Sequence, residues 1–82
     1  MNIKFGSLID ATNFSSFASS LENSNIDLIC GRISVDAKSL IGVANLDFTK
    51  VYDVRFSSTD KEEIDKFLTY IEPLKVKLRK EG

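Results

Sequence analysis

The sequence predicts an α+β domain in which helices pack on one side of a four-stranded sheet. Four short segments alternate apolar and polar residues, and two long segments carry apolar residues at helical spacing. With a short apolar helix between them, the elements follow in the order β-α-β-β-α-β-α. Because each strand has one apolar face and each long helix one apolar stripe, two packed layers bury both. A chain of 82 residues forms one such domain, since it is too short to build two cores.

The first strand and the first helix are predicted from the opening residues. Residues 2–5 alternate, so that Ile3 and Phe5 share one face, and Gly6 ends the strand. Ser7 stands three residues before Asp10, which is the spacing of a helix N-cap with an acidic partner. An apolar stripe of helical period follows, up to residues 23–25. The stripe consists of Leu8, Ala11, Phe14, Phe17, Ala18 and Leu21.

A hairpin and a short helix come next. Residues 26–30 and 33–35 alternate around a turn at residues 31–32, which are Gly and Arg. Ser39 then has the position of an N-cap for a short apolar helix over residues 40–46. The inward side chains expected of the hairpin are Ile26, Leu28, Cys30, Ile33 and Val35.

The last strand and the last helix have the clearest patterns. Residues 51–56 alternate with Tyr52, Val54 and Phe56 inward. Thr59 and Glu62 have capping-box spacing at the start of a helix that Pro73 ends. The apolar stripe of this helix consists of Ile64, Phe67, Leu68 and Ile71.

The predicted core gathers the inward members of all these patterns. We expect Leu68→Ala to cost about 2–5 kcal/mol, as for a fully buried leucine. The core set is Ile3, Phe5, Ala11, Phe14, Ala18, Leu21, Ile26, Leu28, Ile33, Val35, Tyr52, Val54, Phe56, Ile64, Phe67, Leu68 and Ile71.

Charge and cysteine content restrict the class of protein. Lys plus Arg is 11 and Asp plus Glu is 12, a net charge of −1, which argues against a dedicated nucleic-acid-binding protein. No apolar run is long enough to cross a membrane, and the first residues do not resemble a secretory signal. With a single cysteine, Cys30, we expect a protein of the reducing cytoplasm.

The absence of histidine excludes much chemistry. Without histidine there is no Ser-His-Asp triad, no Cys-His dyad and no usual zinc site, so we expect no enzyme, no metal and no cofactor. One acidic cluster has two interpretations: ligands for Mg²⁺ or Ca²⁺, or the negatively charged first turn of a helix. We expect the helix turn. The cluster is Asp60, Glu62, Glu63 and Asp65.

One stretch resembles a known family. Residues 35–43 read Val-Asp-Ala-Lys-Ser-Leu-Ile-Gly-Val, which is similar to the end of the third strand and the start of the second helix in the histidine-containing phosphocarrier protein (HPr) family. The segments 26–28 and 60–71 also lie where that family has them, so the resemblance covers residues 1–72. It implies an HPr-like open-faced sandwich with an antiparallel sheet in the order 1-4-2-3. It also implies a role connected with the bacterial phosphotransferase system.

The phosphoryl-accepting histidine of that family is missing here. The family has Gly-Leu-His-Ala-Arg-Pro where the first helix begins, and its histidine takes a phosphoryl group from phosphoenolpyruvate through enzyme I. In this chain Ser7, or Leu8 after a one-residue slip, stands at the histidine position, and Ile9 or Asp10 replaces the arginine. A hydroxyl cannot form a phosphoramidate, and Asp10 would repel a phosphoryl group. The resemblance therefore implies a non-catalytic regulatory or adaptor protein.

Ser39 stands where many Gram-positive members of the HPr family carry a regulatory serine that an ATP-dependent kinase phosphorylates. A phosphate there would face the positive end of the helix, with Lys38 as a nearby cation. The other interpretation is that Ser39 is only an N-cap. The sequence leaves both interpretations open.

The helix after Ser39 is apolar on two sides. Leu40, Ile41 and Ala44 share one side, and Val43 and Leu46 share the other. If Val43 and Leu46 pack against the sheet, the side chains on the other side of the helix are exposed. In the HPr family this exposed face docks partner proteins. We therefore expect protein partners from the phosphotransferase system or from transcription regulation. The predicted partner-binding residues are Lys38, Ser39, Leu40, Ile41 and Ala44.

The predicted domain covers residues 1–73, and residues 74–82 form a basic tail. We expect a solvated or loosely docked end. The alternatives are an arm that contacts a membrane or nucleic acid, and an added strand, because Leu74, Val76 and Leu78 alternate with basic residues. Four basic residues are few for strong binding to phosphates. The alternative function is a small α/β domain that binds nucleic acid or an anionic surface through this tail.

Overall fold

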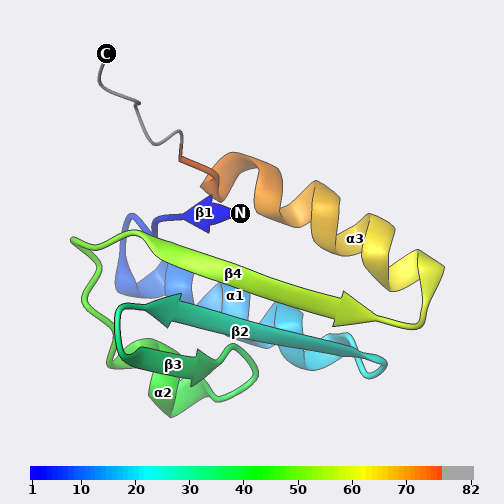
Figure 1. The fold of residues 1–82 in the computed structure, drawn as a ribbon, viewed down its shortest axis with the longest axis horizontal. Helices are drawn as coiled ribbons and strands as arrows, with labels where there is room; N and C mark the ends of the chain where they lie inside the picture. Colours follow the sequence, from blue (N-terminus) through cyan, green and yellow to red (C-terminus); the bar gives the residue numbers. More distant parts are fainter. Residues whose placement is uncertain (77–82) are drawn as a thin grey trace.

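The computed structural model describes residues 1–76 and has the predicted architecture. Its sheet has four antiparallel strands in the order β1-β4-β2-β3, so the predicted class, element order and strand order are confirmed. Figure 1 shows α1 passing behind β4 and β2, with α3 and α2 on either side of it. The elements are β1 (Asn2–Ile3), α1 (Leu8–Ser20), β2 (Ser24–Cys30), β3 (Ile33–Asp36), α2 (Leu40–Ala44), β4 (Tyr52–Ser58), α3 (Lys61–Ile71) and the 3₁₀ turn η1 (Glu72–Leu74).

The core lies between the sheet and the helices, as predicted. Most of the predicted core side chains are fully buried, and Ala37 and Val43 join them. Aromatic rings link the layers: Phe56 of β4 stacks on Phe67 of α3, with ring centroids 3.9 Å apart. Such contacts add to the free energy of burial, because stacked and tilted rings attract one another.

Two side chains of the predicted core, Ile33 and Leu68, are exposed, so these predictions are wrong. A third, Leu8 of the apolar stripe of α1, is exposed as well, although it was not in the core set. Ile33 is 50% exposed because it begins the edge strand β3, which has a neighbouring strand on one side only. Leu68 is 44% exposed: the buried line of α3 runs through Phe67 and Ile71, and the next residue turns away by about 100°. Leu8, 52% exposed, lies in the first turn of α1.

Other predicted core residues are only half-buried. Cys30, Val35 and Phe56 pack against the core from its margin. Ile64 of the core set is also half-buried, as is Phe17, which belongs to the apolar stripe of α1 but not to the core set. The patterns identified the correct face for these side chains but not the depth of burial, which depends on the neighbouring elements.

Helix caps explain where the helices begin. The Ser7 Oγ accepts from the Asp10 N–H at 3.2 Å, so the predicted cap of α1 is confirmed. The cap of α3 is Asp60, not Thr59, because its carboxylate accepts from the N–H groups of Glu62 and Glu63. A carboxylate at an N-cap also interacts favourably with the positive end of the helix.

Further boundaries differ from the predicted ones: β1 ends at Ile3 and not at residue 5, and β4 runs from Tyr52 to Ser58 instead of over residues 51–56. Helix α2 ends at Ala44 and not at residue 46, because the Leu46 N–H bonds to the Val43 carbonyl in a turn. Strand β2 begins at Ser24, within the segment expected to be a loop. Its first residues pair with the end of β4, Ser24 with Ser58 and Asn25 with Ser57.

Residues 74–76, the first of the predicted tail, pair with β1. The Lys4 N–H donates to the Leu74 carbonyl at 3.1 Å, and the Val76 N–H donates to the Asn2 carbonyl at 3.0 Å. Ile3 and Lys75 form an antiparallel bridge, and Leu74 packs against the core. These three residues therefore fit the added-strand interpretation and not a solvated end. The rest of the predicted tail, residues 77–82, lies outside the described residues.

Within residues 1–76 no helix is both long enough and apolar enough to span a bilayer.

Candidate functional site

The turn before α2 places Ser39 at the surface. The Asp36 carboxylate accepts from the Lys38 N–H at 2.9 Å, and the Asp36 carbonyl accepts from the Ser39 N–H at 2.9 Å. The Ser39 Oγ then accepts from the Gly42 N–H at 3.3 Å, which confirms the predicted N-cap. Ser39 is exposed, so its hydroxyl faces solvent as well as the helix end.

Helix α2 divides into a sealed side and an open side, as its sequence predicts. Val43 is fully buried and Leu46 packs against the core. On the other side Leu40 is 52% exposed and Ile41 is 77% exposed. Ala44 is half-buried, so it forms only the margin of the open side. We call Leu40, Ile41 and Ala44 the α2 patch.

Gly42 lets α2 approach β3 closely. A Cβ atom at this position would lie 3.0 Å from the Val35 Cγ1 and 3.2 Å from the Ser39 Oγ. These distances are shorter than ordinary van der Waals contacts, so the Val35 or Ser39 side chain would have to shift by a few tenths of an ångström to admit a larger residue. The glycine therefore allows α2 and the Val35 side chain to pack closely.

Lys38 does not provide the expected cation beside Ser39. Its ammonium donates to the Leu21 carbonyl at the end of α1, with 2.8 Å between Nζ and oxygen. The Ser19 hydroxyl donates in turn to the Lys38 carbonyl. Because a cation is favourable at a helix C-terminus, Lys38 ties α2 to α1. Its ammonium therefore points to α1 and away from a ligand at Ser39.

Ser7, which the resemblance to the HPr family aligns with its histidine, begins a helix with exposed aliphatic side chains. Ser7 is occupied as the cap of α1, and Ile9 behind it is 69% exposed. The exposure of Leu8 was not predicted, because Leu8 fits the apolar stripe of the helix. The available signal was Ile9, a large aliphatic residue outside that stripe. The first turn of α1 thus combines the exposed Leu8 and Ile9 side chains with one carboxylate, that of Asp10.

The acidic cluster at the start of α3 is a structural network. The Glu63 carboxylate is buried and accepts from the Asn23 N–H at 3.0 Å, the Asn23 side-chain amide at 3.1 Å and the Ser24 hydroxyl at 2.8 Å. The Ser58 hydroxyl, which bonds to Ser24, continues the network to β4. In the described part of the chain no three acidic or sulfur side chains converge on a metal position. Glu63 thus joins the start of α3 to the loop between α1 and β2.

The loop between α2 and β4 is held by its own hydrogen bonds. The Tyr52 hydroxyl donates to the Asp47 carbonyl at 2.9 Å and accepts from the Asp47 N–H at 3.0 Å. Burial raises the pKa of Tyr52. Hydrogen bonds from the Thr49 hydroxyl and N–H lower the pKa of Asp47. This loop is therefore anchored, although it has no regular secondary structure.

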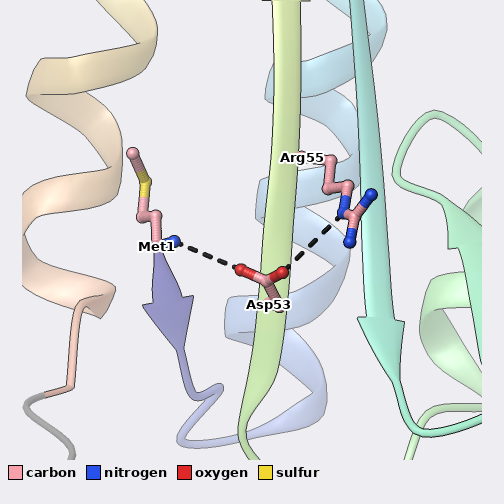
Figure 2. A network of polar contacts seen from close by, with 3 residues as sticks. All are labelled: Met1, Asp53 and Arg55. Carbon is pink, nitrogen blue, oxygen red and sulfur yellow. Dashed lines mark hydrogen bonds and ion pairs between the residues drawn. The ribbon is translucent and has the colours of Figure 1, made fainter.

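The uncovered face of the sheet carries charges of both signs. Figure 2 shows the Asp53 carboxylate between two cations, the Met1 ammonium at 3.2 Å and the Arg55 Nε at 3.8 Å. Across the ladder, Arg55 is paired in register with Asp27. At these residues the face therefore carries charges of both signs and not the uniformly positive charge that attracts a polyanion.

Comparison of the chain with protein-family models, with curated proteins and with solved structures found no match.

Proposed function

We propose that this protein is a non-catalytic, HPr-like binding module that docks a protein partner through the α2 patch. The observation that carries the proposal is the exposure of Leu40 and Ile41 on a helix whose opposite side is sealed by Val43. Apolar side chains clustered on a rigid helix are typical of interaction sites. The resemblance of residues 35–43 to the HPr family supports partners from the phosphotransferase system or from transcription regulation.

The carrier reaction of the HPr family is not part of the proposal. The chain has no histidine, and the Ser7 hydroxyl is engaged as a helix cap. We expect no acid-labile, base-stable phosphate on the chain after incubation with phosphoenolpyruvate and enzyme I. Detection of such a label would contradict this part of the proposal.

Ser39 is the proposed switch of the docking surface. Its hydroxyl is exposed beside Leu40, so a phosphate would add about −1.5 to −2 charges at the border of the apolar patch. That charge would attract an arginine on one partner and repel an acidic border on another. Because Lys38 bonds to Leu21, its ammonium does not neutralise this charge.

The first test changes Ile41, the most exposed residue of the patch. Immobilised wild-type protein, Ile41→Glu and the control Glu62→Gln are incubated with extract of the native cell, and the retained proteins are compared. We expect the same protein to be retained by wild type and control and to be lost with Ile41→Glu. Circular dichroism should show an unchanged fold, because the side chain lies outside the core. Retention by Ile41→Glu, or unfolding of this variant, would contradict the proposal.

The second test changes Ser39. Ser39→Asp keeps an oxygen acceptor at the N-cap and adds a negative charge, so we expect little change in stability. Partner affinity should change measurably in a binding titration with the protein found in the first test. Ser39→Asn, which keeps the cap without the charge, is the matched control. Equal affinities of all three proteins would show that Ser39 is only a helix cap.

A further inference from the structure

The two edges of the sheet differ in the main-chain groups that they leave open. Beyond β1, residues 74–76 direct the Lys75 N–H away from the sheet, but the Glu72 carbonyl accepts from it at 3.3 Å. The opposite edge is β3, which pairs with β2 on one side, and no strand within residues 1–76 pairs with its other side. Figure 1 shows this outer side of β3 at the margin of the sheet. We call it the β3 edge.

The hydrogen bonds between β2 and β3 show which groups face the β3 edge. The Ala37 N–H donates to the Ile26 carbonyl at 2.9 Å. Because hydrogen-bonded and non-hydrogen-bonded pairs alternate in an antiparallel ladder, every second residue before Ala37 also faces β2. The residues between them, Ser34 and Asp36, therefore direct their N–H and carbonyl groups at the β3 edge. The Asp36 carbonyl accepts from the Ser39 N–H, so both groups of Ser34 and the Asp36 N–H are those that a further strand can use.

Opposite charges lie at the two ends of the β3 edge. Arg32 precedes β3 and Asp36 ends it, and both are exposed. Within residues 1–76 neither side chain forms an ion pair, while the Asp36 carboxylate accepts from the Lys38 N–H. Between them the exposed Ile33 and the half-buried Val35 lie on the face of the sheet that the helices cover. A strand that pairs here therefore meets a fixed order of charged and apolar side chains.

Helix α2 restricts what can occupy the β3 edge. Gly42 packs closely against the Val35 side chain, and Figure 1 shows α2 behind β3 and reaching past its outer side. If two copies paired through β3, the twofold axis between the antiparallel strands would place both helix layers on the same side of the sheet. Each copy would then bring its own α2 to the same position under the shared edge. A single extended segment has no such helix and fits beside β3 above α2.

We infer that the β3 edge binds an extended segment of a partner protein as an added antiparallel strand. The open N–H and carbonyl groups of Ser34 supply the main-chain hydrogen bonds of this mode of recognition. The segment carries a lysine or arginine opposite Asp36 and a carboxylate opposite Arg32, because opposite charges in facing positions attract. Apolar residues flank its central position and lie beside Ile33 and Val35. This site differs from the α2 patch, and the inference does not rest on the proposed function.

The test is an NMR titration of the ¹⁵N-labelled full chain with two blocked pentapeptides of the same composition, Lys-Val-Thr-Val-Glu and Glu-Val-Thr-Val-Lys. We expect the first peptide, in which the cation precedes the carboxylate, to shift the amide signals of Ser34 and Asp36. It should bind about fivefold more tightly than the second, which places like charges opposite each other. The signals of Asn2 and Lys4, at the other edge of the sheet, should stay unchanged. Equal binding of both peptides, or tighter binding of the second, would overturn the inference.

Methyl groups on the peptide nitrogens test the main-chain bonds without altering the protein. The N–H of the central threonine would donate to the Ser34 carbonyl, so methylation of this nitrogen should weaken binding about tenfold. The N–H of the valine before it points away from β3, and its methylation should leave binding nearly unchanged. Equal effects of the two methyl groups would show that the peptide does not add to the sheet as a strand.

Charge variants complete the test. Asp36→Asn keeps an acceptor for the Lys38 N–H but loses the charge opposite the peptide lysine, so it should weaken binding of the first peptide about threefold. Arg32→Gln should have an effect of similar size at the other end, and Glu62→Gln on α3 is the control. Binding that neither edge variant weakens relative to this control would contradict the inference. A dimer of the free protein that the first peptide dissociates would assign the β3 edge to a second copy and would also overturn it.

Discussion

Helices α2 and α3 flank the same helix, but they are attached to the fold very differently. Helix α3 places Phe67 and Ile71 in the core and is joined to the α1–β2 loop through Glu63. Its cap, the Asp60 carboxylate, accepts from two backbone N–H groups of the first turn. Helix α2 has five residues, places only Val43 in the core and is capped by one bond to Ser39. Nevertheless α2 carries the more exposed aliphatic side chains.

This difference separates residues that stabilise the fold from residues that remain free for binding. In α3, Phe67 stacks on Phe56 of β4, and the Glu63 carboxylate accepts hydrogen bonds from Asn23 and Ser24. In α2 a single valine and a close-packed glycine fix the helix, and Leu40 and Ile41 contribute little to the core. Substitutions in α3 should therefore change the free energy of unfolding, and substitutions in the α2 patch should change binding.

The largest effect is expected at the centre of the α3 interface. Phe67→Ala removes a fully buried ring that stacks on Phe56, and it should cost about 3–5 kcal/mol of unfolding free energy. Urea unfolding followed by circular dichroism measures this cost. A domain of this size has little stability in reserve, so the variant is expected to be partly unfolded at room temperature. A loss below about 1 kcal/mol would mean that α3 is not anchored through Phe67.

A smaller loss is expected when the polar attachment of α3 is removed. Glu63→Ala leaves the Asn23 N–H and the Ser24 hydroxyl without their acceptor, which should cost about 1–3 kcal/mol. Glu62→Ala, one position earlier on the exposed side, is the matched control and should change stability by less than about 0.5 kcal/mol. Equal losses in both variants would show that the Glu63 network does not hold α3.

The hydrogen bonds that anchor the loop between α2 and β4 can be tested by measuring stability as a function of pH. Tyr52→Phe removes both hydrogen bonds to Asp47 and should cost about 1 kcal/mol at neutral pH. The folded pKa of Tyr52 is raised, so its contribution is complete below the unfolded pKa of about 10 and is lost as the pH rises through the folded pKa. The stability difference between wild type and variant should therefore narrow above about pH 10. A constant difference from pH 7 to 11 would contradict this account.

The smallest loss of stability is expected for Leu68→Ala. It tests the observed orientation of α3 against the orientation that its sequence pattern predicts. Because Leu68 is 44% exposed, Leu68→Ala should cost less than about 1 kcal/mol, compared with the 2–5 kcal/mol expected for a buried leucine. Thermal unfolding of this variant next to Phe67→Ala provides the comparison. A loss as large as that of a buried leucine would mean that α3 is rotated toward Leu68.

The periodic patterns predicted the elements because each inward face has a simple period. Alternation identified Ile26, Leu28 and Val54 as buried, and the helical stripe identified Phe14 and Phe67. The two sides of α2 were also predicted correctly, because Ile41 and Val43, two residues apart, lie on opposite sides of a short helix. Each of these side chains is buried if it faces the other layer of the fold and exposed if it faces away, so its position in the period is enough to predict its burial.

Other features depend on contacts between distant segments, which a local pattern does not contain. Leu8 follows the stripe of α1 but lies in its first turn, where it remains exposed. Glu63 has the composition of an exposed helix start, yet Asn23 and Ser24 from another loop surround its carboxylate. The Lys38 ammonium likewise donates to the Leu21 carbonyl, which belongs to a distant segment of the chain. The sequence around Lys38 does not indicate this contact.

The pairing of residues 74–76 with β1 has a consequence for the order in which the chain folds. Strand β1 is held on one side by β4 and on the other by the segment that follows η1, so Ile3 pairs with both Tyr52 and Lys75. The β2–β3 hairpin closes through Gly31, which has a positive φ of 59°, and needs only local contacts. Closing long loops costs more entropy and proceeds more slowly than closing a hairpin. We therefore expect the hairpin to form early and β1 to join the sheet last, when both ends of the described chain meet beside it.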